Sequence, residues 1–208
     1  MSDLFKISIK GILKVDNRYL LRQNERNEWE LLGGKLEDED ESPENRLIQE
    51  FLEESGIAIK INRQLESWLY EIGATNIIVL PFDCDAIKIP DELYDQDGGT
   101  LCWFDKENLK ALNIPQGYFC SIREQIPSRS YSHVPNQKPT DRVLHGRTVY
   151  VRVTEPNGAH ERLLSYHQNP RQVAEELLKD FGISKVRLVS TPAIIEPGKL
   201  LLNYAISD

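Results

Sequence analysis

Glu50, Glu53 and Glu54 are the residues of this chain whose type and spacing could do chemistry most directly. A helix turns by about 100° per residue, so the three carboxylates would share one side while Leu47 and Phe51 lie on the other. Carboxylates this close repel one another unless a cation lies among them, and hard oxygen ligands suit Mg²⁺ or Mn²⁺. The alternative is a solvated helix face, which three glutamates also form.

A glycine pair, Gly33 and Gly34, precedes this segment, and Lys35 follows the pair. Glycine has no Cβ, so the backbone here can come close to a metal ion or a phosphate. Lys35 could contact a phosphate as a point charge. Together these parts would serve phosphoryl or diphosphate transfer, because cations neutralise the developing charge and a bound water becomes the nucleophile.

The elements that must position these residues are predicted from local signals. Ser42 can cap a helix that starts at Pro43, and Gly56 can end it in the left-handed conformation. Before it, the alternation from Lys6 to Val15 and the turn residues Asp16-Asn17 predict a hairpin. Further strands are predicted around Ile57–Ile61, Leu65–Glu71, Asn76–Phe82 and Leu101–Phe104, and helices from about Lys106 and around Tyr118–Ile126.

The segment Gly33–Ile57, GGKLEDEDESPENRLIQEFLEESGI, resembles the Nudix box. The family pattern is Gly, five residues, Glu, seven residues, then Arg-Glu-apolar-x-Glu-Glu-x-Gly-apolar. From Glu41 onward the chain has the same spacing and ends on Glu53-Glu54-Ser55-Gly56-Ile57. The resemblance covers about residues 4–126 and none of the rest.

The resemblance implies an α/β fold with a mixed β-sheet between helices. It also implies hydrolysis of a nucleoside diphosphate linked to another group, such as a nucleotide sugar, an ADP-ribose-like compound or a nucleotide polyphosphate. Glu50 and Glu54 would bind Mg²⁺ or Mn²⁺, and Glu53 would be a third ligand or a group that orients water. The carbonyl of Gly34 is a further predicted ligand.

Other parts of the site lie outside the box. Family members often add a carboxylate from a later loop, for which Asp97 is our candidate and Asp95 the alternative. Arg22 and Arg26 flank the expected cleft and, with Lys35, are predicted to contact the phosphates of the substrate. As arginines near a surface, Arg22 and Arg26 could equally well be solvated.

The chain departs from the family pattern at two places. Six residues separate Gly34 from Glu41 where the family has five, so the loop has one inserted residue. Gln49 replaces the box arginine, which in the family pairs with the box glutamates and holds them in place. Glutamine can hydrogen-bond a carboxylate but brings no charge, so it predicts glutamates held less firmly. Slow turnover, or binding without turnover, would follow.

Charge is distributed unevenly along the 208 residues, whose net charge is −8. Residues 1–126 carry 25 acidic and 14 basic side chains, a net of −11, whereas 127–208 carry 8 and 11, a net of +3. We therefore expect a Nudix-like domain at 1–126, a linker at 127–146 and a small α+β domain at 147–208. Neither part is basic enough to predict nucleic acid as a partner.

Several features predict a cytoplasmic protein without a membrane partner. No apolar run approaches the ~18 residues of a membrane-spanning helix, and the start MSDLFKISIK has no apolar stretch typical of a signal peptide. Cys84, Cys102 and Cys120 are an odd number with no Cys-x-x-Cys pair, so free thiols are expected, as in a reducing compartment.

The second unit is predicted to be β-β-α-β-β. Its first strand contains Val149–Val153, Asn157-Gly158 predicts a hairpin, and Asn169-Pro170 begins a helix that ends at Gly182. The last two strands are expected at Lys185–Val189 and Leu200–Ile206.

Three hypotheses for the whole chain follow. The first is a metal-dependent pyrophosphohydrolase with an accessory domain. The second is a non-catalytic nucleotide sensor that acts through its C-terminal domain. In the third, residues 127–208 only complete a homodimer, with Val149–Val153 pairing at a sheet edge.

Overall fold

The computed structural model describes residues 3–37, 40, 42–96, 98–127, 130–132, 146–155, 158–183 and 187–207. Its first part contains β1 (Lys6–Val15), β2 (Arg18–Gln23), β3 (Trp29–Glu30), α1 (Pro43–Ser55), β4 (Ala58–Gln64), β5 (Trp68–Ile72), β6 (Thr75–Lys88), β7 (Thr100–Asp105), a 3-10 turn (Asn108–Ala111), α2 (Gln116–Ile122) and β8 (Ser130–Ser132). Its second part contains β9 (Thr148–Glu155), β10 (Gly158–Leu163), α3 (Pro170–Asp180), β11 (Arg187–Glu196) and β12 (Lys199–Ser207).

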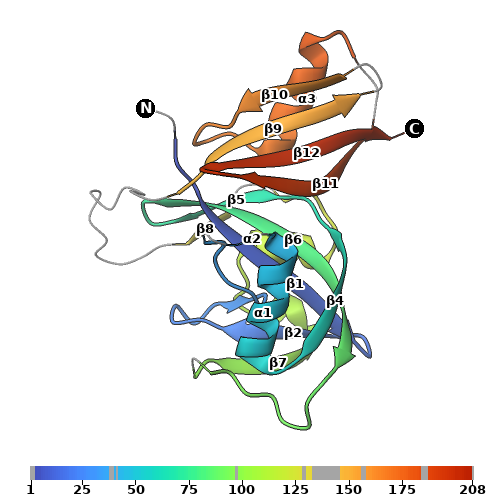
Figure 1. The fold of residues 1–208 in the computed structure, drawn as a ribbon. Helices are drawn as coiled ribbons and strands as arrows, with labels where there is room; N and C mark the ends of the chain where they lie inside the picture. Colours follow the sequence, from blue (N-terminus) through green and yellow to red (C-terminus); the bar gives the residue numbers. More distant parts are fainter. Residues whose placement is uncertain are drawn as a thin grey trace.

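The described strands form two sheets, which lie one above the other in Figure 1. The larger sheet has the order β3-β2-β1-β6-β5-β8, with β4 paired to β6 and β7 paired to β2. Its centre is the parallel pair β1 and β6, and most other neighbours are antiparallel. The larger sheet is therefore mixed, as expected.

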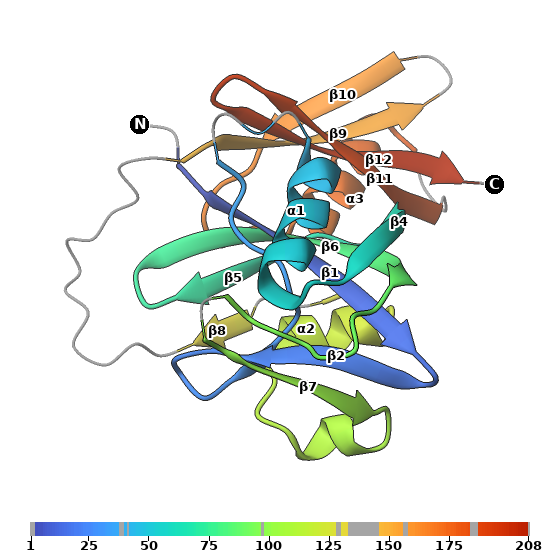
Figure 2. The same cartoon turned by 60° about the horizontal axis from the view of Figure 1, so that its bottom comes forward.

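Helices pack on both faces of the larger sheet. Leu47 and Phe51 of α1 are fully buried in the cluster that contains Ile9 of β1. Tyr118 of α2 packs in a second cluster with Trp68 of β5. Figure 2 shows α1 in front of β1 and β6. The predicted arrangement of a mixed sheet between helices is confirmed.

The capping signals place α1 as predicted. The Ser42 side chain accepts a hydrogen bond from the backbone N–H of Asn45, Pro43 is the first helical residue, and Gly56 has φ 68°. The N–H of Gly56 donates to the carbonyl of Leu52 and closes the last turn. Both ends of the helix that carries the three glutamates are thus fixed by local chemistry.

The smaller sheet has the order β10-β9-β12-β11, with α3 packed against β9 and β10. The expected β-β-α-β-β order is confirmed, although Asn157 and Lys185 lie outside the described residues. Val149, Val151 and Val153 are fully buried. Because β9 pairs with β10 on one side and with β12 on the other, the prediction that Val149–Val153 forms a sheet edge is wrong.

The two parts of the chain are joined at the start of β1. The backbones of Phe5 and Arg147 exchange two hydrogen bonds of 3.0 Å. Arg147 is buried, with 3% of the residue exposed. Its guanidinium donates to the carbonyls of Glu196 (3.0 Å) and Glu37 (3.1 Å). Arg147 therefore connects the start of β1, the loop before α1 and the end of β11.

A second contact between the parts is polar and buried. The hydroxyl of Tyr204 donates to Glu66 at 2.7 Å, and Arg171 of α3 lies 3.2 Å from the same carboxylate.

Ser130–Ser132, in the segment expected to be a linker, instead forms β8 and pairs in parallel with β5. Residues 133–145 lie outside the described part of the chain.

Two smaller observations concern the thiols and the membrane. Cys84 and Cys120 are buried and Cys102 is half-buried, and all three are free thiols. Burial raises the pKa of the Cys84 thiol to about 12, so it is not reactive near neutral pH. Among the described helices, none combines the length and the apolar character needed to span a bilayer.

Replacing Gly11 by alanine is expected to destabilise the fold by about 1–3 kcal/mol, the usual cost of overpacking a core. An added Cβ would lie 2.4 Å from Cε2 of the fully buried Phe51 ring. Urea unfolding would measure the loss. Gly158→Ala is the matched control, since nothing lies within 4 Å of its Cβ. Equal stability of the two variants would contradict the packing of α1 on β1.

The stability contributed by Glu66 is expected to depend on pH. Burial raises the pKa of Glu66 above its ordinary value of 4.5, although Tyr204 and Arg171 act in the opposite direction. The neutral form therefore favours folding, and this contribution is lost as the pH rises through the folded pKa. The free energy of unfolding would be measured for wild type and Glu66→Gln from below pH 4.5 to neutral pH. As the pH rises, the stability of the variant relative to wild type should increase. A constant difference would contradict this.

Candidate metal-binding and catalytic site

The two glutamates Glu50 and Glu54 lie against the glycine pair. Both are only 8% exposed, because α1 turns them toward the strands, whereas Glu53 is exposed. The backbone N–H of Gly33 donates to Oε2 of Glu54 at 2.8 Å. A Cβ on Gly34 would lie 1.9 Å from Oε1 of Glu50, so only glycine leaves room for this carboxylate.

Burial and nearby cations act in opposite directions on these carboxylates. Burial raises the pKa of Glu50 and that of Glu54. The charge of Arg46 opposes this at Glu50, and the charges of Lys10 and Arg22 oppose it at Glu54. Arg46 donates a hydrogen bond to Glu50, and Arg22 Nε lies 3.6 Å from Oε1 of Glu54. The site therefore holds two buried carboxylates that attract cations.

The two glycine carbonyls point to different partners. The carbonyl of Gly34 accepts from the N–H of Ile9 (3.0 Å) and from the hydroxyl of Ser8 (3.3 Å). The carbonyl of Gly33 accepts from Nζ of Lys10 at 2.7 Å. Gly34 as a metal ligand thus stays a prediction, while the Gly33 carbonyl is the one that faces a cation.

Asp95 is linked to the site through an arginine. Its side chain is 1% exposed and accepts from Nε of Arg22 at 2.6 Å. Burial lowers the pKa of Arg22, but the hydrogen bond to Asp95 and the charge of Glu54 outweigh it and raise the pKa overall. Asp97, our first candidate for the added carboxylate, lies outside the described residues. Asp95 therefore supports Arg22 at the side of Glu54.

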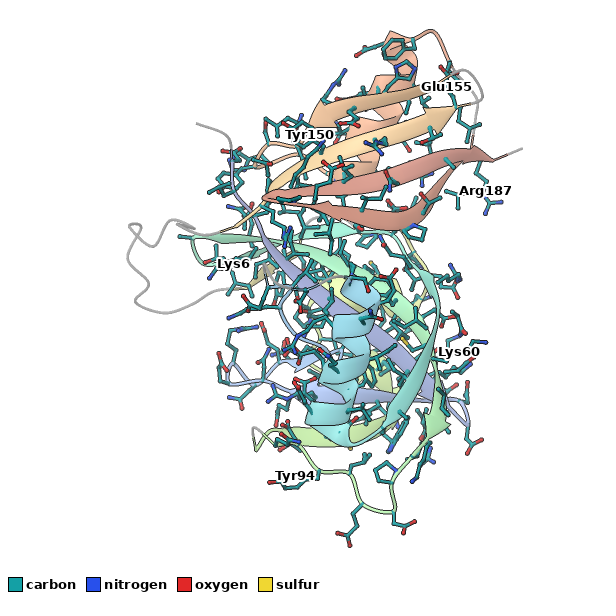
Figure 3. The ribbon with its side chains drawn as sticks, in the orientation of Figure 1. Lys6, Lys60, Tyr94, Tyr150, Glu155 and Arg187 are labelled. Atoms are coloured by element: carbon teal, nitrogen blue, oxygen red, sulfur yellow. The ribbon has the colours of Figure 1, made fainter. Side chains whose placement is uncertain are left out.

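A cleft of about 220 Å³ opens beside the glycine pair and Glu54. Three residues of β1, Lys6, Ser8 and Lys10, line one wall, and Figure 3 shows Lys6 where β1 approaches the smaller sheet. The predicted phosphate-binding residues all line it: Arg22, Arg26 and Lys35. The remaining lining residues include aromatic and apolar side chains, namely Ile7, Tyr70, Ile72, Ile77 and Tyr118. A cleft of this kind can hold a phosphate chain beside a ring.

The cations of the cleft differ in how they are paired. Lys10 lies 3.6 Å from Glu30, and Arg26 lies 2.8 Å from Glu28. Lys35 is exposed, and no ion pair involving it occurs among the described residues. Lys35 is thus the predicted phosphate-binding residue whose charge is most available to a ligand.

Sequence reasoning missed Lys10 and Arg46. A signal for Lys10 was present, because a buried central strand that carries Lys6, Ser8 and Lys10 on one face must offer that face to something polar. Arg46 lies four residues before Glu50, the spacing that pairs charges on a helix. The positions of both residues in the sequence pattern could be recognised, but the groups that they contact in the fold could not.

The residues fit a hard divalent cation. No ready-made group of three or more His, Cys, Asp or Glu side chains converges among the described residues. However, Glu50 and Glu54 offer carboxylate oxygens beside Gly34, where a Cβ would occupy the space next to Glu50. Mg²⁺ is commonly held by one or two carboxylates, with waters and substrate phosphates completing its shell. The donor set is thus sufficient for Mg²⁺ or Mn²⁺.

Replacing Gly34 by alanine is expected to weaken Mn²⁺ binding by roughly 10–100-fold, the usual cost of disturbing a ligand's support. The added Cβ would occupy the place of Oε1 of Glu50, while the backbone at Gly34 does not need a positive φ. Titration calorimetry would measure the affinity, and Gly158→Ala serves as the control. Unchanged affinity would mean that Glu50 is not a ligand.

Comparisons with known proteins give structural matches alone. No protein-family model and no curated protein matches the chain. The chain is similar to a mutator MutT protein from Bacillus halodurans, with 20% identity and a TM-score of 0.49 over 64% of this chain and 94% of that one. A Nudix-family hydrolase from Clostridium perfringens has 20% identity and a TM-score of 0.47 over 60% of this chain and 96% of that one. An ADP-ribose pyrophosphatase from Streptococcus suis has 16% identity and a TM-score of 0.39 over 61% and 98%. These structural neighbours are Nudix hydrolases, the family that the segment Gly33–Ile57 resembles.

Proposed function

We propose that this chain is a pyrophosphohydrolase that uses Mg²⁺ or Mn²⁺ to cleave the diphosphate bond of a nucleoside diphosphate linked to another group. The observation that carries the proposal is the burial of Glu50 and Glu54 against Gly33 and Gly34, because Glu54 and both glycines line a cleft that is also lined with cations. The resemblance of the same segment to the Nudix box supports it. Cytoplasmic action and a homodimer belong to the same proposal.

In this proposal the residues of α1 hold the metal and the water. Glu50 and Glu54 bind the cation, and the N–H of Gly33 keeps Glu54 oriented. A divalent ion bound here supplies a more acidic water and offsets phosphate charge. Glu53, which lies on the same side of α1 and is exposed, would orient the attacking water or accept its proton.

The wall of the cleft binds the diphosphate. Lys35 contributes a charge with no carboxylate partner among the described residues, so it is available to a phosphate oxygen. Arg22 and Arg26 line the same cleft, and each is oriented by a carboxylate, Asp95 and Glu28 respectively. Fixed cations of this kind stabilise the charge that develops as a phosphate leaves.

One observation favours a second candidate, a nucleotide sensor. Arg147 of the second part donates to the carbonyl of Glu37, which lies in the loop between the glycine pair and α1. A ligand that changes the conformation of this loop would therefore change its contact with the smaller sheet. If the chain binds a nucleotide without cleaving it, this contact would transmit the binding event to the smaller sheet and to a partner bound there.

The expected outcome is cleavage that depends on Glu54. Purified protein with Mg²⁺ or Mn²⁺ would be offered ADP-ribose, NADH, dinucleoside polyphosphates, nucleotide sugars, coenzyme A and nucleoside triphosphates, with products followed by mass spectrometry. Glu54→Gln should lower activity by more than the roughly 10–100-fold that is typical when a residue supporting a metal ligand, rather than the ligand itself, is replaced. Glu44→Gln, on the same helix but in its first turn, is the control and should stay active.

The outcomes separate the two candidates. Turnover that disappears in Glu54→Gln supports the hydrolase and names its substrate class. No turnover of any compound would contradict the hydrolase. If one compound then still raised the melting temperature, the sensor would be favoured.

A further inference from the structure

Arg46 is the one basic residue of α1, and it lies on the same side as the box glutamates. Its guanidinium donates to Oε1 of Glu50, one turn further along the helix. It also lies 3.8 Å from Oε2 of Glu53. The side chains of Arg46 and Glu50 are 24% and 10% exposed, so their contact is shielded in part from water, whereas the Glu53 side chain is 54% exposed. One arginine thus contacts two of the three glutamates.

Gln49 makes no comparable contact. It occupies the position of the box arginine, but it is exposed, and no hydrogen bond from it to Glu50, Glu53 or Glu54 is found among the described residues. The expectation that Gln49 would hold a box carboxylate by a hydrogen bond is therefore not met in the structure. The arginine that holds Glu50 comes from one turn earlier in the helix.

Each buried carboxylate of the site has its own arginine. Arg22 of β2 lies beside Glu54, and Arg46 of α1 contacts Glu50. Removing Arg46 would leave Glu50 buried beside Glu53 and Glu54 without the side chain that now contacts it, although the charge of Lys10 still acts on it. A carboxylate without that contact is free to turn toward solvent, away from the position of a metal ligand.

The Nε of Arg46 adds a further observation. It is buried and has no hydrogen-bond partner among the described residues. An unpaired buried donor costs free energy. The contacts with the glutamates are the interactions that offset this cost.

We propose that Arg46 is a positioning residue that takes over, from position 46, the task for which the chain has no arginine at position 49. It holds the Glu50 carboxylate in place for the divalent cation and limits the repulsion between Glu50 and Glu53. This inference rests on the proposed function, since it assigns Arg46 a role toward the metal that Glu50 and Glu54 bind.

The test compares the arginine with a conservative and a truncated replacement at the same position. Four proteins are compared: wild type, Arg46→Ala, Arg46→Lys and Arg63→Ala. Arg63 is the matched control, because it pairs with Glu124 on the surface of another part of the sheet. Mn²⁺ affinity is measured by paramagnetic resonance at a temperature where melting curves in chelator show all four to be folded.

Arg46→Ala is expected to weaken Mn²⁺ binding by roughly 10–100-fold, as loss of an outer contact does. Arg46→Lys should keep more of the affinity than Arg46→Ala, since it keeps a cation four residues before Glu50. Arg63→Ala should bind as wild type does. Where turnover is seen, kcat should follow the same order, with KM for the nucleotide changing less.

Three results would overturn the inference. They are unchanged or tighter Mn²⁺ binding by Arg46→Ala, a loss in Arg46→Lys as large as in Arg46→Ala, and an equal loss in Arg63→Ala. If wild type binds Mn²⁺ and turns over substrate while Arg46→Ala matches it, only the role of Arg46 fails. If wild type neither binds Mn²⁺ nor turns over any substrate, the proposed function fails as well.

Discussion

The arrangement of the site depends on one constraint, the burial of two carboxylates against a backbone that has no Cβ. Glu54 is held by the N–H of Gly33, and Glu50 occupies the volume that a side chain at position 34 would need. Such burial is costly unless cations are close. The cations near the site, above all Arg22 and Arg46, offset part of this cost. A divalent ion bound by the two carboxylates would offset more of it.

Much of the fold could be predicted from local signals, and the exceptions have physical causes. The strand predicted to end at Phe82 continues to Lys88 as β6, although Pro81 lies inside it. Pro81 lies where the partner of β6 changes from β5 to β4, and an interruption of the antiparallel pairing is a place where a strand tolerates proline; its carbonyl accepts from the N–H of Leu65. Pro192 similarly lies at a bulge of the edge strand β11, where a proline is tolerated. In both cases tertiary pairing decided what the local pattern could not.

The candidate site could be predicted in part. The glutamates and the glycine pair have fixed spacing along the chain, so their meeting at α1 follows from a helix and a loop. Lys10 and Asp95 enter the site through the pairing of distant strands and loops, which no local pattern encodes. Arg46 is different, because its spacing to Glu50 was visible, but its value depends on which face of α1 is buried.

The exchange of hydrogen bonds between Phe5 and Arg147 has a consequence for synthesis of the chain. Phe5 is synthesised before both of its partners in the second part, Arg147 and Tyr166, whose ring packs on Phe5 at 5.1 Å. Lys6, the next residue, pairs with Ile77 of β6, so β1 can join the larger sheet before the second part exists. The residue just before β1 therefore reaches its final partners only after Tyr166 has been synthesised, and the joining of the two parts is a late step of folding.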